Sequence, residues 1–417
     1  MNVLWLTHHP MPNASKLMGE KGNPLGGWMA SLAESLSQVK DIKLCIAYPK
    51  NNIVRIEEVF DGKVFHYAIP RKTMNYDHSM EVHFAQLVAK CNPDVVHLHG
   101  TEFAHGLALM KACPREKYVV SIQGLVSIYA KHYFSGLPPK VVESCTLRDF
   151  IKRDNIPKGM ENYQKLGVIE QEILKNTQHV IGRTEWDKAC TRQLAPNAQY
   201  HFCNESLRGS FYEHSWSLSD CQNHSIFLSQ GGYPIKGLHF VLEALPAIRE
   251  RFPDVHVYVA GANIINTATI TKRLRLTSYG QYIIKLLKKH DLFSCVTFLG
   301  AQNEEDMCKR FLQAHVFVSP SSIENSPNSL GEAMLLGVPS VASAVGGVAD
   351  LMLHRKEGFI YQYDASYMLA HYICEIFSND HMAEEFSKNA KKRAQTTHNR
   401  EVNLNNLLTI YRAIREA

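Results

Sequence analysis

Paired cysteines and long apolar runs are both missing from this 417-residue chain. Its ten cysteines are scattered without a Cys-x-x-Cys pair, which indicates reduced, incidental thiols rather than a disulfide framework. No stretch approaches the ~20 apolar residues that a membrane-spanning helix needs, and the first residues show no basic leader followed by a long apolar stretch. We therefore expect a cytoplasmic protein whose contact with a membrane, if any, is peripheral.

Several common catalytic motifs are missing as well. The chain has no Gly-x-Ser-x-Gly elbow and no Walker loop, which argues against esterase and kinase chemistry. It has no Asp-x-Asp, so a metal-bridged diphosphate is not indicated and we expect no metal site. With 45% hydrophobic residues, 20% charged residues and a net charge of +5, the composition is that of an ordinary globular protein and does not indicate nucleic-acid binding.

Short apolar runs rich in β-formers alternate with longer helical patterns along the chain. This alternation predicts βαβ units and parallel sheets. The strands expected before the middle of the chain are 3–7, 43–48, 64–69, 94–99, 118–122 and 179–182. Those expected after it are 225–229, 255–260, 295–299, 315–319, 340–343 and 359–361. The sequence therefore predicts two consecutive α/β domains of similar size.

A polar, serine-rich stretch separates the two series of strands. We expect an N-terminal domain at 1–205, a linker at 206–223 and a C-terminal domain at 224–395. Residues 396–417 place apolar side chains at helical spacing, which predicts an amphipathic terminal helix. This helix packs either on its own domain or back across the boundary on the N-terminal one.

The strongest chemical signal is the segment 319–339, where an apolar strand leads through a polar loop into a helix. Ser326 is the expected N-cap, and Pro327 the first helical residue. The start of a helix offers unpaired N–H groups and the positive end of its dipole, which suits a diphosphate. Glu332 would accept hydrogen bonds from two ribose hydroxyls, and Glu324 would reach the hydroxyls of a sugar. A lone pair of glutamates is more often solvated, but this strand–loop–helix context favours a binding site.

The same segment carries a family resemblance. Glu324 and Glu332 form a Glu-x7-Glu pattern, followed by Ala-Met-x-x-Gly-x-Pro at 333–339 and Ala-Val-Gly-Gly-Val-Ala-Asp at 344–350. These motifs resemble the signature of glycosyltransferase family 4, the group 1 retaining enzymes, and the resemblance extends over nearly the whole chain.

This resemblance implies the GT-B fold, with two Rossmann-like parallel-sheet domains facing a central cleft. The N-terminal domain would lie on the acceptor side, and the C-terminal domain would bind the nucleotide sugar. Glu324 would contact the donor sugar and Glu332 the ribose. The loop residues expected against sugar and phosphate are Asn325, Ser326, Pro327, Asn328 and Ser329.

A second element, Ser-Gln-Gly-Gly-Tyr-Pro-Ile-Lys-Gly at 229–237, follows the first strand of the C-terminal domain. Its glycines let the backbone approach a ligand, and Lys236 supplies a positive charge for phosphate oxygens. Such a charge stabilises a nucleoside diphosphate as it leaves, so we predict that Lys236 and Glu324 are the catalytic residues. Many members of the family carry an arginine where this chain has Gly231. Arg183 of the N-terminal domain is a candidate replacement, and the alternative is a structural arginine.

The N-terminal domain supplies weaker candidates for substrate binding. Gly26 and Gly27 stand where the family has a phosphate-binding loop, although most such pairs are simple turns. His99, at the end of a predicted strand, either lines the cleft or belongs to the core. Gln123 stands where the family often has a histidine near the donor sugar. Glutamine binds hydroxyls but cannot take up a proton near neutral pH, which puts a general-base role in doubt.

Two glycines end predicted strands of the C-terminal domain, at the edge where open α/β sheets bind ligands. The resemblance places the donor diphosphate near Gly261 and the nucleotide base near Gly300. Either glycine could also be an ordinary turn residue.

We therefore expect a metal-independent hexosyltransferase that uses a nucleotide-diphosphate sugar as co-substrate and no cofactor. The acceptor would be a glycan or a lipid-linked molecule, in surface polysaccharide biosynthesis. Two alternatives are a sugar-nucleotide epimerase of the same fold and a non-catalytic sugar-nucleotide sensor. Residues 131–175 mix basic and aromatic side chains, so they either rest on the inner face of an anionic membrane or form a solvated face.

Overall fold

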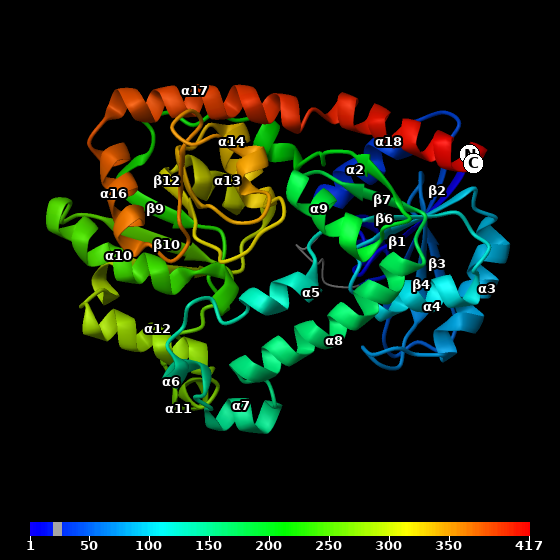
Figure 1. The fold of residues 1–417 in the computed structure, drawn as a ribbon, viewed down its shortest axis with the longest axis horizontal. Coiled ribbons are helices and arrows are strands. Elements are labelled where there is room, and N and C mark those ends of the chain that lie inside the picture. Colours follow the sequence, from blue (N-terminus) through cyan, green and yellow to red (C-terminus); the bar gives the residue numbers. More distant parts are fainter. Residues whose placement is uncertain (20–26) are drawn as a thin grey trace. The chain divides into compact units, whose positions relative to one another are not determined.

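The computed structural model describes residues 1–19 and 27–417. The chain forms two compact units (Figure 1). The first comprises Met1–Ile128, Gln164–Arg208 and His398–Ala417, and the second comprises Tyr129–Tyr163 and Gly209–Thr397. Each unit is an α/β layer structure built on one sheet.

The sheet of the first unit has the strand order β3-β4-β2-β1-β5-β6-β7-β8. Its pairs are parallel except for β3 with β4. The strands are β1 (Asn2–Leu6), β2 (Lys43–Lys50), β3 (Glu57–Phe60), β4 (Phe65–Pro70), β5 (Val95–His99), β6 (Tyr118–Ser121), β7 (His179–Gly182) and β8 (Gln199–Phe202). The two strands that the sequence does not predict, β3 and β8, are the edge strands. Each buries little, so neither carries the continuous apolar run that marks a central parallel strand.

The sheet of the second unit has the order β11-β10-β9-β12-β13-β14 and is parallel throughout. Its strands are β9 (Gln222–Leu228), β10 (His256–Ala260), β11 (Val296–Gly300), β12 (Ala314–Ser319), β13 (Ser340–Ser343) and β14 (Phe359–Tyr361). Each lies within a few residues of its predicted place. The prediction of two parallel α/β sheets is confirmed.

Each unit contains helices as well as its sheet. Those of the first unit are α1 (Pro12–Leu17), α2 (Gly27–Ser37), α3 (Ser79–Cys91), α4 (Ala104–Ala112), α9 (Glu185–Leu194) and α18 (Arg400–Glu416). The boundary between the units falls within α5 (Val126–Tyr129) and α8 (Ile156–Lys175). Those of the second unit are α6 (Pro139–Val142), α7 (Leu147–Lys152), α10 (Leu238–Arg251), α11 (Ile270–Arg273), α12 (Ser278–Lys289), α13 (Glu304–Leu312), α14 (Asn328–Leu336), α15 (Val348–Leu351), α16 (Ser366–Phe377) and α17 (Asp380–Thr397). Among the described residues, every helix is too short or too polar to cross a bilayer.

The side chains of β1 point alternately to the two faces of the sheet and enter the core of the first unit on both. Val3 and Trp5 point to one face of the sheet, where α2 and α18 cover them, and Leu4 and Leu6 point to the other, beneath α3 and α4. All four side chains are buried.

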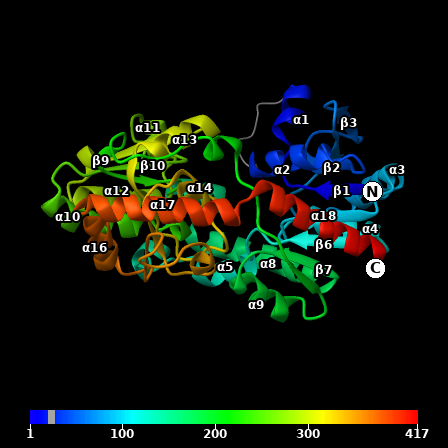
Figure 2. The same cartoon turned by 90° about the horizontal axis from the view of Figure 1, so that it is seen from above.

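The last helix, α18, belongs to the first unit. It lies along α2, as Figure 2 shows. The hydroxyl of Tyr411 accepts a hydrogen bond of 2.9 Å from Nε1 of Trp5 and lies 2.5 Å from Nδ1 of His97. The terminal amphipathic pattern is therefore explained by burial against the sheet at the beginning of the chain.

Residues 129–163 correct the domain boundaries predicted from the sequence, which placed them in the N-terminal domain. They group with the second unit because specific hydrogen bonds tie them to it. Nε2 of His239 donates to the carbonyl oxygen of Ser135 at 2.8 Å, and the hydroxyl of Thr146 donates to the carbonyl oxygen of Leu276 at 2.8 Å.

The predicted linker is also largely part of the second unit, from Gly209 onward. The backbone N–H of Trp216 donates to the carbonyl of Leu336, and its indole N–H to the carbonyl of Ala314, both at 2.8 Å. These two bonds and the burial of the indole make the segment a packed element rather than a free connection.

Candidate functional site

The centre of the candidate site in the second unit is the loop between β12 and α14. The helix begins at Asn328, one residue later than predicted, and Pro327 rather than Ser326 is its N-cap. Pro327 has an extended backbone (φ −68°, ψ 112°) and no side-chain oxygen, so no side chain at this position caps the helix. Gly337 ends the helix in a left-handed conformation (φ 84°), as the sequence predicts. The N–H groups of Leu330 and Gly331 donate to the carbonyl of Pro327, so those of Asn328 and Ser329 are the ones that the start of α14 offers to an anion.

The side chains of the two predicted catalytic residues, Lys236 and Glu324, contact each other at this loop. Nζ of Lys236 lies 2.5 Å from Oε1 of Glu324, which also accepts a hydrogen bond of 2.7 Å from the hydroxyl of Ser321. Burial alone would lower the pKa of Lys236, but the Glu324 carboxylate and the Tyr233 side chain together outweigh burial and raise that pKa above its usual value. Lys236 is therefore a firmly protonated cation at neutral pH. Its side chain keeps 23% of its surface exposed, so it remains accessible.

Two glycines hold the loop that carries Glu324. Gly346 has φ of +48°, and a Cβ atom there would lie 1.8 Å from the carbonyl oxygen of Glu324. Gly237, directly after Lys236, has φ of +68°, and a Cβ atom there would lie 1.9 Å from the carbonyl oxygen of Pro320. Both positions combine a left-handed backbone with a close approach, so only glycine fits. The loop is thereby positioned by the Gly-Gly pair at 346–347 and by the Lys-Gly pair at 236–237.

The remaining predicted residues of this loop lie around the same point. Glu332 is buried on α14, little more than one turn from the start of the helix. Asn325, Ser326 and Pro327 are buried, whereas Asn328 and Ser329 are half-buried, so the first turn of the helix is the most accessible part of the segment.

Three residues near this pair were not predicted. Tyr129 accepts a hydrogen bond of 2.9 Å from the backbone N–H of Asn325, and Tyr233 places its ring centroid 5.9 Å from Nζ of Lys236. Ser321 binds the Glu324 carboxylate, as described above. Ser321 and Tyr233 lie inside the two motifs and could have been found from them. Tyr129 comes from the segment that changes units, and no local pattern signals it.

The strand-end glycines of the second unit have distinct conformations. Gly261 (φ +91°) donates its N–H to the carbonyl of Gly300 (φ +79°) at 2.9 Å, which joins the carboxyl ends of β10 and β11. Gly231 is buried, and a Cβ atom there would lie 2.9 Å from Cγ1 of Val259. An arginine therefore cannot replace Gly231 unless Val259 moves, which gives a packing reason for its absence.

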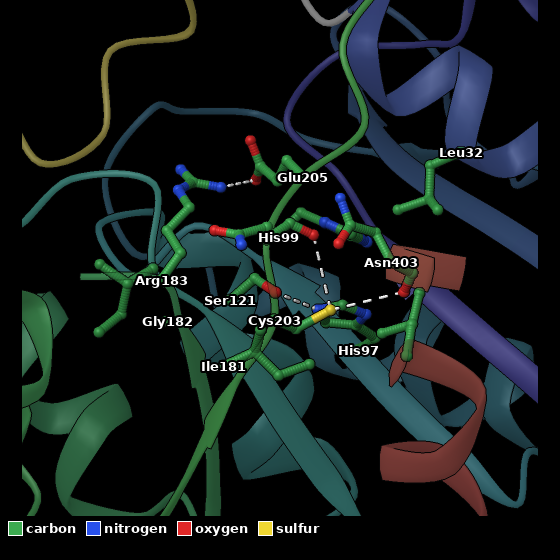
Figure 3. A pocket seen from close by; sticks show the side chains of 13 residues that line it. Leu32, His97, His99, Ser121, Ile181, Gly182, Arg183, Cys203, Glu205 and Asn403 are labelled. Carbon is green, nitrogen blue, oxygen red and sulfur yellow. Dashed lines mark hydrogen bonds and ion pairs between the residues drawn. The ribbon is translucent and has the colours of Figure 1, made fainter. Parts of the chain in front are cut away.

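In the first unit, Gln123, Arg183 and Glu205 come together, each just beyond the carboxyl end of one of three neighbouring strands. Figure 3 shows the side chains of Arg183 and Glu205 pointing toward each other. The guanidinium of Arg183 forms an ion pair with the Glu205 carboxylate. Nε2 of Gln123 donates to Oε1 of Glu205 at 3.0 Å, and Nη2 of Arg183 donates to Oε1 of Gln123 at 3.5 Å. Arg183 is only 7% exposed. Its charge is thus already paired within the first unit, and no motif in the sequence marks Glu205 as its partner.

His99 lies deep in the first unit. It stacks on His97 with ring centroids 4.0 Å apart and meets Trp5 edge-on at 4.5 Å. Burial lowers the pKa of His99 to about 3, so its ring is neutral near pH 7. It lines a pocket of about 20 Å³ that also touches Arg183 and Cys203. Such a volume holds about one water molecule, which is too small for a sugar.

The last predicted residues fall at the start of α2. Gly27 is its first residue, and Gly26 lies outside the described residues. Within residues 1–19 and 27–417, no three His, Cys, Asp or Glu side chains gather as a metal ion requires.

Solved structures share the whole architecture. The sucrose-phosphate synthase of Thermosynechococcus elongatus is similar with a TM-score of 0.72 and 18% identity, over 99% of this chain and 98% of that one. Anabaena Alr3699/HepE, solved in complex with UDP and glucose, has a TM-score of 0.68 and 15% identity, over 99% of this chain and all of the other. These similarities confirm the predicted GT-B fold class.

The sequence comparisons identify the family of the second unit. Residues 217–393 match the family described as "Glycosyl transferases group 1". This segment of the chain is therefore a group 1 glycosyl transferase domain, and the predicted resemblance is confirmed there. The chain is 26% identical over 180 residues to Spore coat protein SA of Bacillus subtilis (strain 168), which covers 42% of this chain and 45% of that relative. The aligned part thus spans less than half the length of the curated relatives that it matches first.

Proposed function

We propose that the protein is a retaining glycosyltransferase that moves a sugar from a nucleotide-diphosphate donor to a glycan or lipid-linked acceptor. The observation that carries the proposal is the pairing of Lys236 with Glu324 beside the uncapped start of α14. A cation and a helix N-terminus together suit a diphosphate, and the adjacent carboxylate suits sugar hydroxyls. The surface-polysaccharide role rests on the family resemblance.

In this proposal, Lys236 and the first N–H groups of α14 bind the donor diphosphate. As the bond between the anomeric carbon and the phosphate oxygen breaks, negative charge grows on that oxygen, and these groups stabilise it. The acceptor hydroxyl attacks the anomeric carbon from the same face and gives its proton to the departing phosphate. The configuration is thereby retained without a covalent enzyme intermediate. Glu332 would accept hydrogen bonds from the ribose, and Glu324 would orient the donor sugar.

The first test is a thermal-shift panel of ADP, CDP, GDP, TDP and UDP on the wild type and on Glu332→Ala. A ligand that binds only the folded state stabilises it by ~2.7 kcal/mol at 100 times its dissociation constant. We expect one nucleotide to raise the melting temperature of the wild type and to lose that effect in Glu332→Ala. Glu305→Ala, which changes an exposed glutamate on α13, should keep the shift. The absence of a shift with every nucleotide would contradict the proposed donor site.

The second test separates transfer from the alternatives. The matching sugar nucleotide is incubated with the protein, and the products are analysed by mass spectrometry and sugar chromatography. Release of the nucleoside diphosphate, with the sugar found on water or an acceptor, supports a transferase. Conversion of the donor to an epimeric sugar nucleotide would indicate an epimerase, and binding without turnover in the presence of glycan and lipid acceptors would indicate a sensor.

A further inference from the structure

A cluster of large apolar side chains lies exposed on α7 and α11 in the second unit. Phe150 and Ile270 each expose 75% of their surface, and the other members are also more than half exposed. Basic residues stand between and beside them. We call this the α7–α11 surface; its apolar members are Leu147, Phe150, Ile151, Ile270 and Leu274, and its basic members are Lys152, Arg153, Lys272, Arg273 and Arg275.

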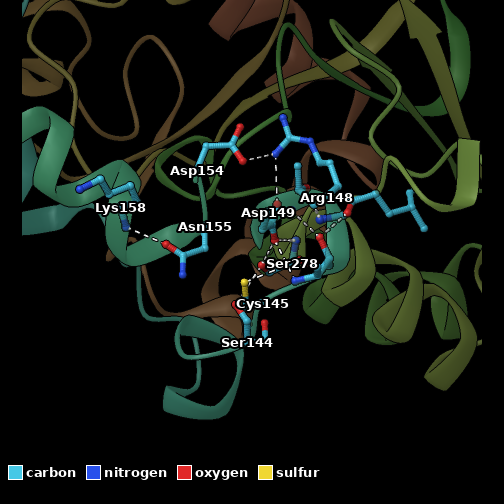
Figure 4. Close-up of polar contacts among 12 residues, drawn as sticks. Ser144, Cys145, Arg148, Asp149, Asp154, Asn155, Lys158 and Ser278 are labelled. Atoms are coloured by element: carbon cyan, nitrogen blue, oxygen red, sulfur yellow. Dashed lines mark hydrogen bonds and ion pairs between the residues drawn. The ribbon is translucent and has the colours of Figure 1, made fainter. Parts of the chain in front are cut away.

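Hydrogen bonds fix the start of α7 to the turn that follows α11 and to the first residue of α12 (Figure 4). Asp149 and Thr146 form a capping box at the start of α7. The same Asp149 carboxylate accepts a hydrogen bond of 2.8 Å from the backbone N–H of Ser278, and another from its hydroxyl. The Thr146 hydroxyl donates to the Leu276 carbonyl at 2.8 Å. These bonds, and the pocket that Arg148 of α7 and Lys272 of α11 both line, place the two helices next to each other.

The surface is strongly cationic. Residues 140–158 and 263–277 together contain eight basic and three acidic residues, and one of the basic ones, Lys158, pairs with the adjacent Glu161. Of the acidic ones, Asp149 is buried in the capping box, and Oδ1 of Asp154 lies 2.5 Å from the guanidinium of Arg148. A pocket of about 270 Å³ beside α11 is lined by Arg148, Lys272 and Arg275 with the amides Asn263 and Asn266. Arg148 already pairs with Asp149 and Asp154, so Lys272 and Arg275 are the cations that, together with the amide donors, suit a phosphate group.

Two properties of the surface, its exposed apolar side chains and its positive charge, determine which partner it fits. Nucleic acid would bind the basic residues, but it would leave the exposed aliphatic and aromatic side chains in contact with water. A second copy of the chain in a two-fold dimer would place the same cations against one another, which is unfavourable. An anionic bilayer satisfies both properties, because its headgroups attract basic residues and its interface accepts apolar side chains.

We propose that the α7–α11 surface docks on an anionic lipid bilayer, with Phe150, Ile151 and Ile270 entering the interface and the basic pocket receiving a lipid phosphate. This contact would be a property of the second unit. It does not rest on the proposed transferase activity, since none of its residues belongs to the donor site.

The test is co-sedimentation of the full chain with vesicles. One set is phosphatidylcholine alone, and the other is phosphatidylcholine with 30% phosphatidylglycerol, each at low and at high salt. The apolar variant is Phe150→Ser with Ile151→Ser, and the charge variant is Lys272→Glu with Arg275→Glu. Matched controls are Tyr367→Ser, another highly exposed side chain, and Lys388→Glu with Lys392→Glu on α17. Melting temperatures confirm that each variant is folded; because all substituted side chains are exposed, we expect little change.

We expect binding to the anionic vesicles, weak binding to phosphatidylcholine and release at high salt. The apolar and charge variants should each lower the partition coefficient about tenfold or more, and the controls should not. The proposal is overturned if anionic vesicles are not bound, or if the controls weaken binding as much as the surface variants. It is also overturned if analytical ultracentrifugation shows a dimer that the apolar variant dissociates, since a second copy would then cover the surface.

Discussion

Lys236 and Glu324 are 88 positions apart in the chain, and their side chains lie 2.5 Å apart in one polar contact. The pair joins the loop after β9 to the loop after β12, which are adjacent strands of the second sheet. In the absence of a ligand each group neutralises the other. A bound diphosphate would accept hydrogen bonds from the Lys236 ammonium group in place of Glu324. The Glu324 carboxylate would then be free to accept hydrogen bonds from a sugar.

Replacing Lys236 by glutamine tests the lysine as a stabiliser of the leaving group. We expect kcat to fall by ~10²–10³, because the charge that develops on the diphosphate loses its closest cation. The measurement is initial-rate kinetics of nucleoside diphosphate release at saturating donor. Lys309→Gln, on α13, is the control and should keep its rate. A Lys236→Gln enzyme with normal kcat and a raised KM would instead assign the lysine to ground-state binding.

Substitutions in the buried ion pair of Arg183 and Glu205 test whether Arg183 has a structural role or binds the donor. Removing one partner of a buried ion pair leaves an uncompensated charge, so we expect Arg183→Met to lose ~3–5 kcal/mol of stability. The double variant Arg183→Met with Glu205→Gln should recover part of this loss. Denaturant unfolding of the single and double variants measures both effects. A folded Arg183→Met enzyme of normal stability with at least tenfold weaker donor affinity would show that the arginine binds donor instead.

A substitution at Gly346 tests whether the loop between β12 and α14 depends on a glycine in the left-handed conformation. Gly346→Ala places a methyl group against the Glu324 carbonyl, so we expect a loss of at least ~2 kcal/mol and a displaced loop. Gly232 is the matched control, because a Cβ atom there meets nothing within 4 Å, and Gly232→Ala should change stability by less than ~0.5 kcal/mol. The measurement is thermal unfolding of the two variants. Equal melting temperatures would contradict the proposal that Gly346 holds the loop in place.

Buried histidines should make the fold sensitive to acid. Burial lowers the pKa of His239 to about 4, and its hydrogen bond to Ser135 opposes this only in part. Because the pKa in the unfolded chain is ~6.5, His239 contributes stability above that pH and loses it as the pH falls toward 4. This one group accounts for at most ~3 kcal/mol. We expect His239→Gln to flatten the decline of melting temperature between pH 6.5 and 4, and His381→Gln, at an exposed position, to leave it unchanged. An identical slope in His239→Gln would contradict the assignment.

The sequence predicts those parts of the fold whose signal is contiguous. The strand at 340–343 and the glycine that ends α14 are found as expected, because a short apolar run and a C-terminal glycine are local features. The edge strands β3 and β8 are missed because they bury few side chains. The N-cap of α14 is misplaced by one residue because a proline occupies the position that a serine was expected to fill.

The candidate site shows the same limit. Lys236 and Glu324 could be predicted because each lies in a contiguous motif, although their contact could not. Tyr129 and Glu205 come close to predicted residues only through the fold, and spacing along the chain carries no information about that. The transfer of residues 129–163 to the second unit depends on hydrogen bonds to residues more than a hundred positions away, such as that between Ser135 and His239.

The position of α18 has a consequence for synthesis on the ribosome. Trp5 and His97 are made early, yet the helix that covers them emerges only after the whole second unit has been translated. During that interval the nascent first unit exposes the apolar part of its sheet that α18 covers in the finished fold. Chaperones that recognise such surfaces would therefore have a long window in which to bind, and release would coincide with the arrival of Tyr411.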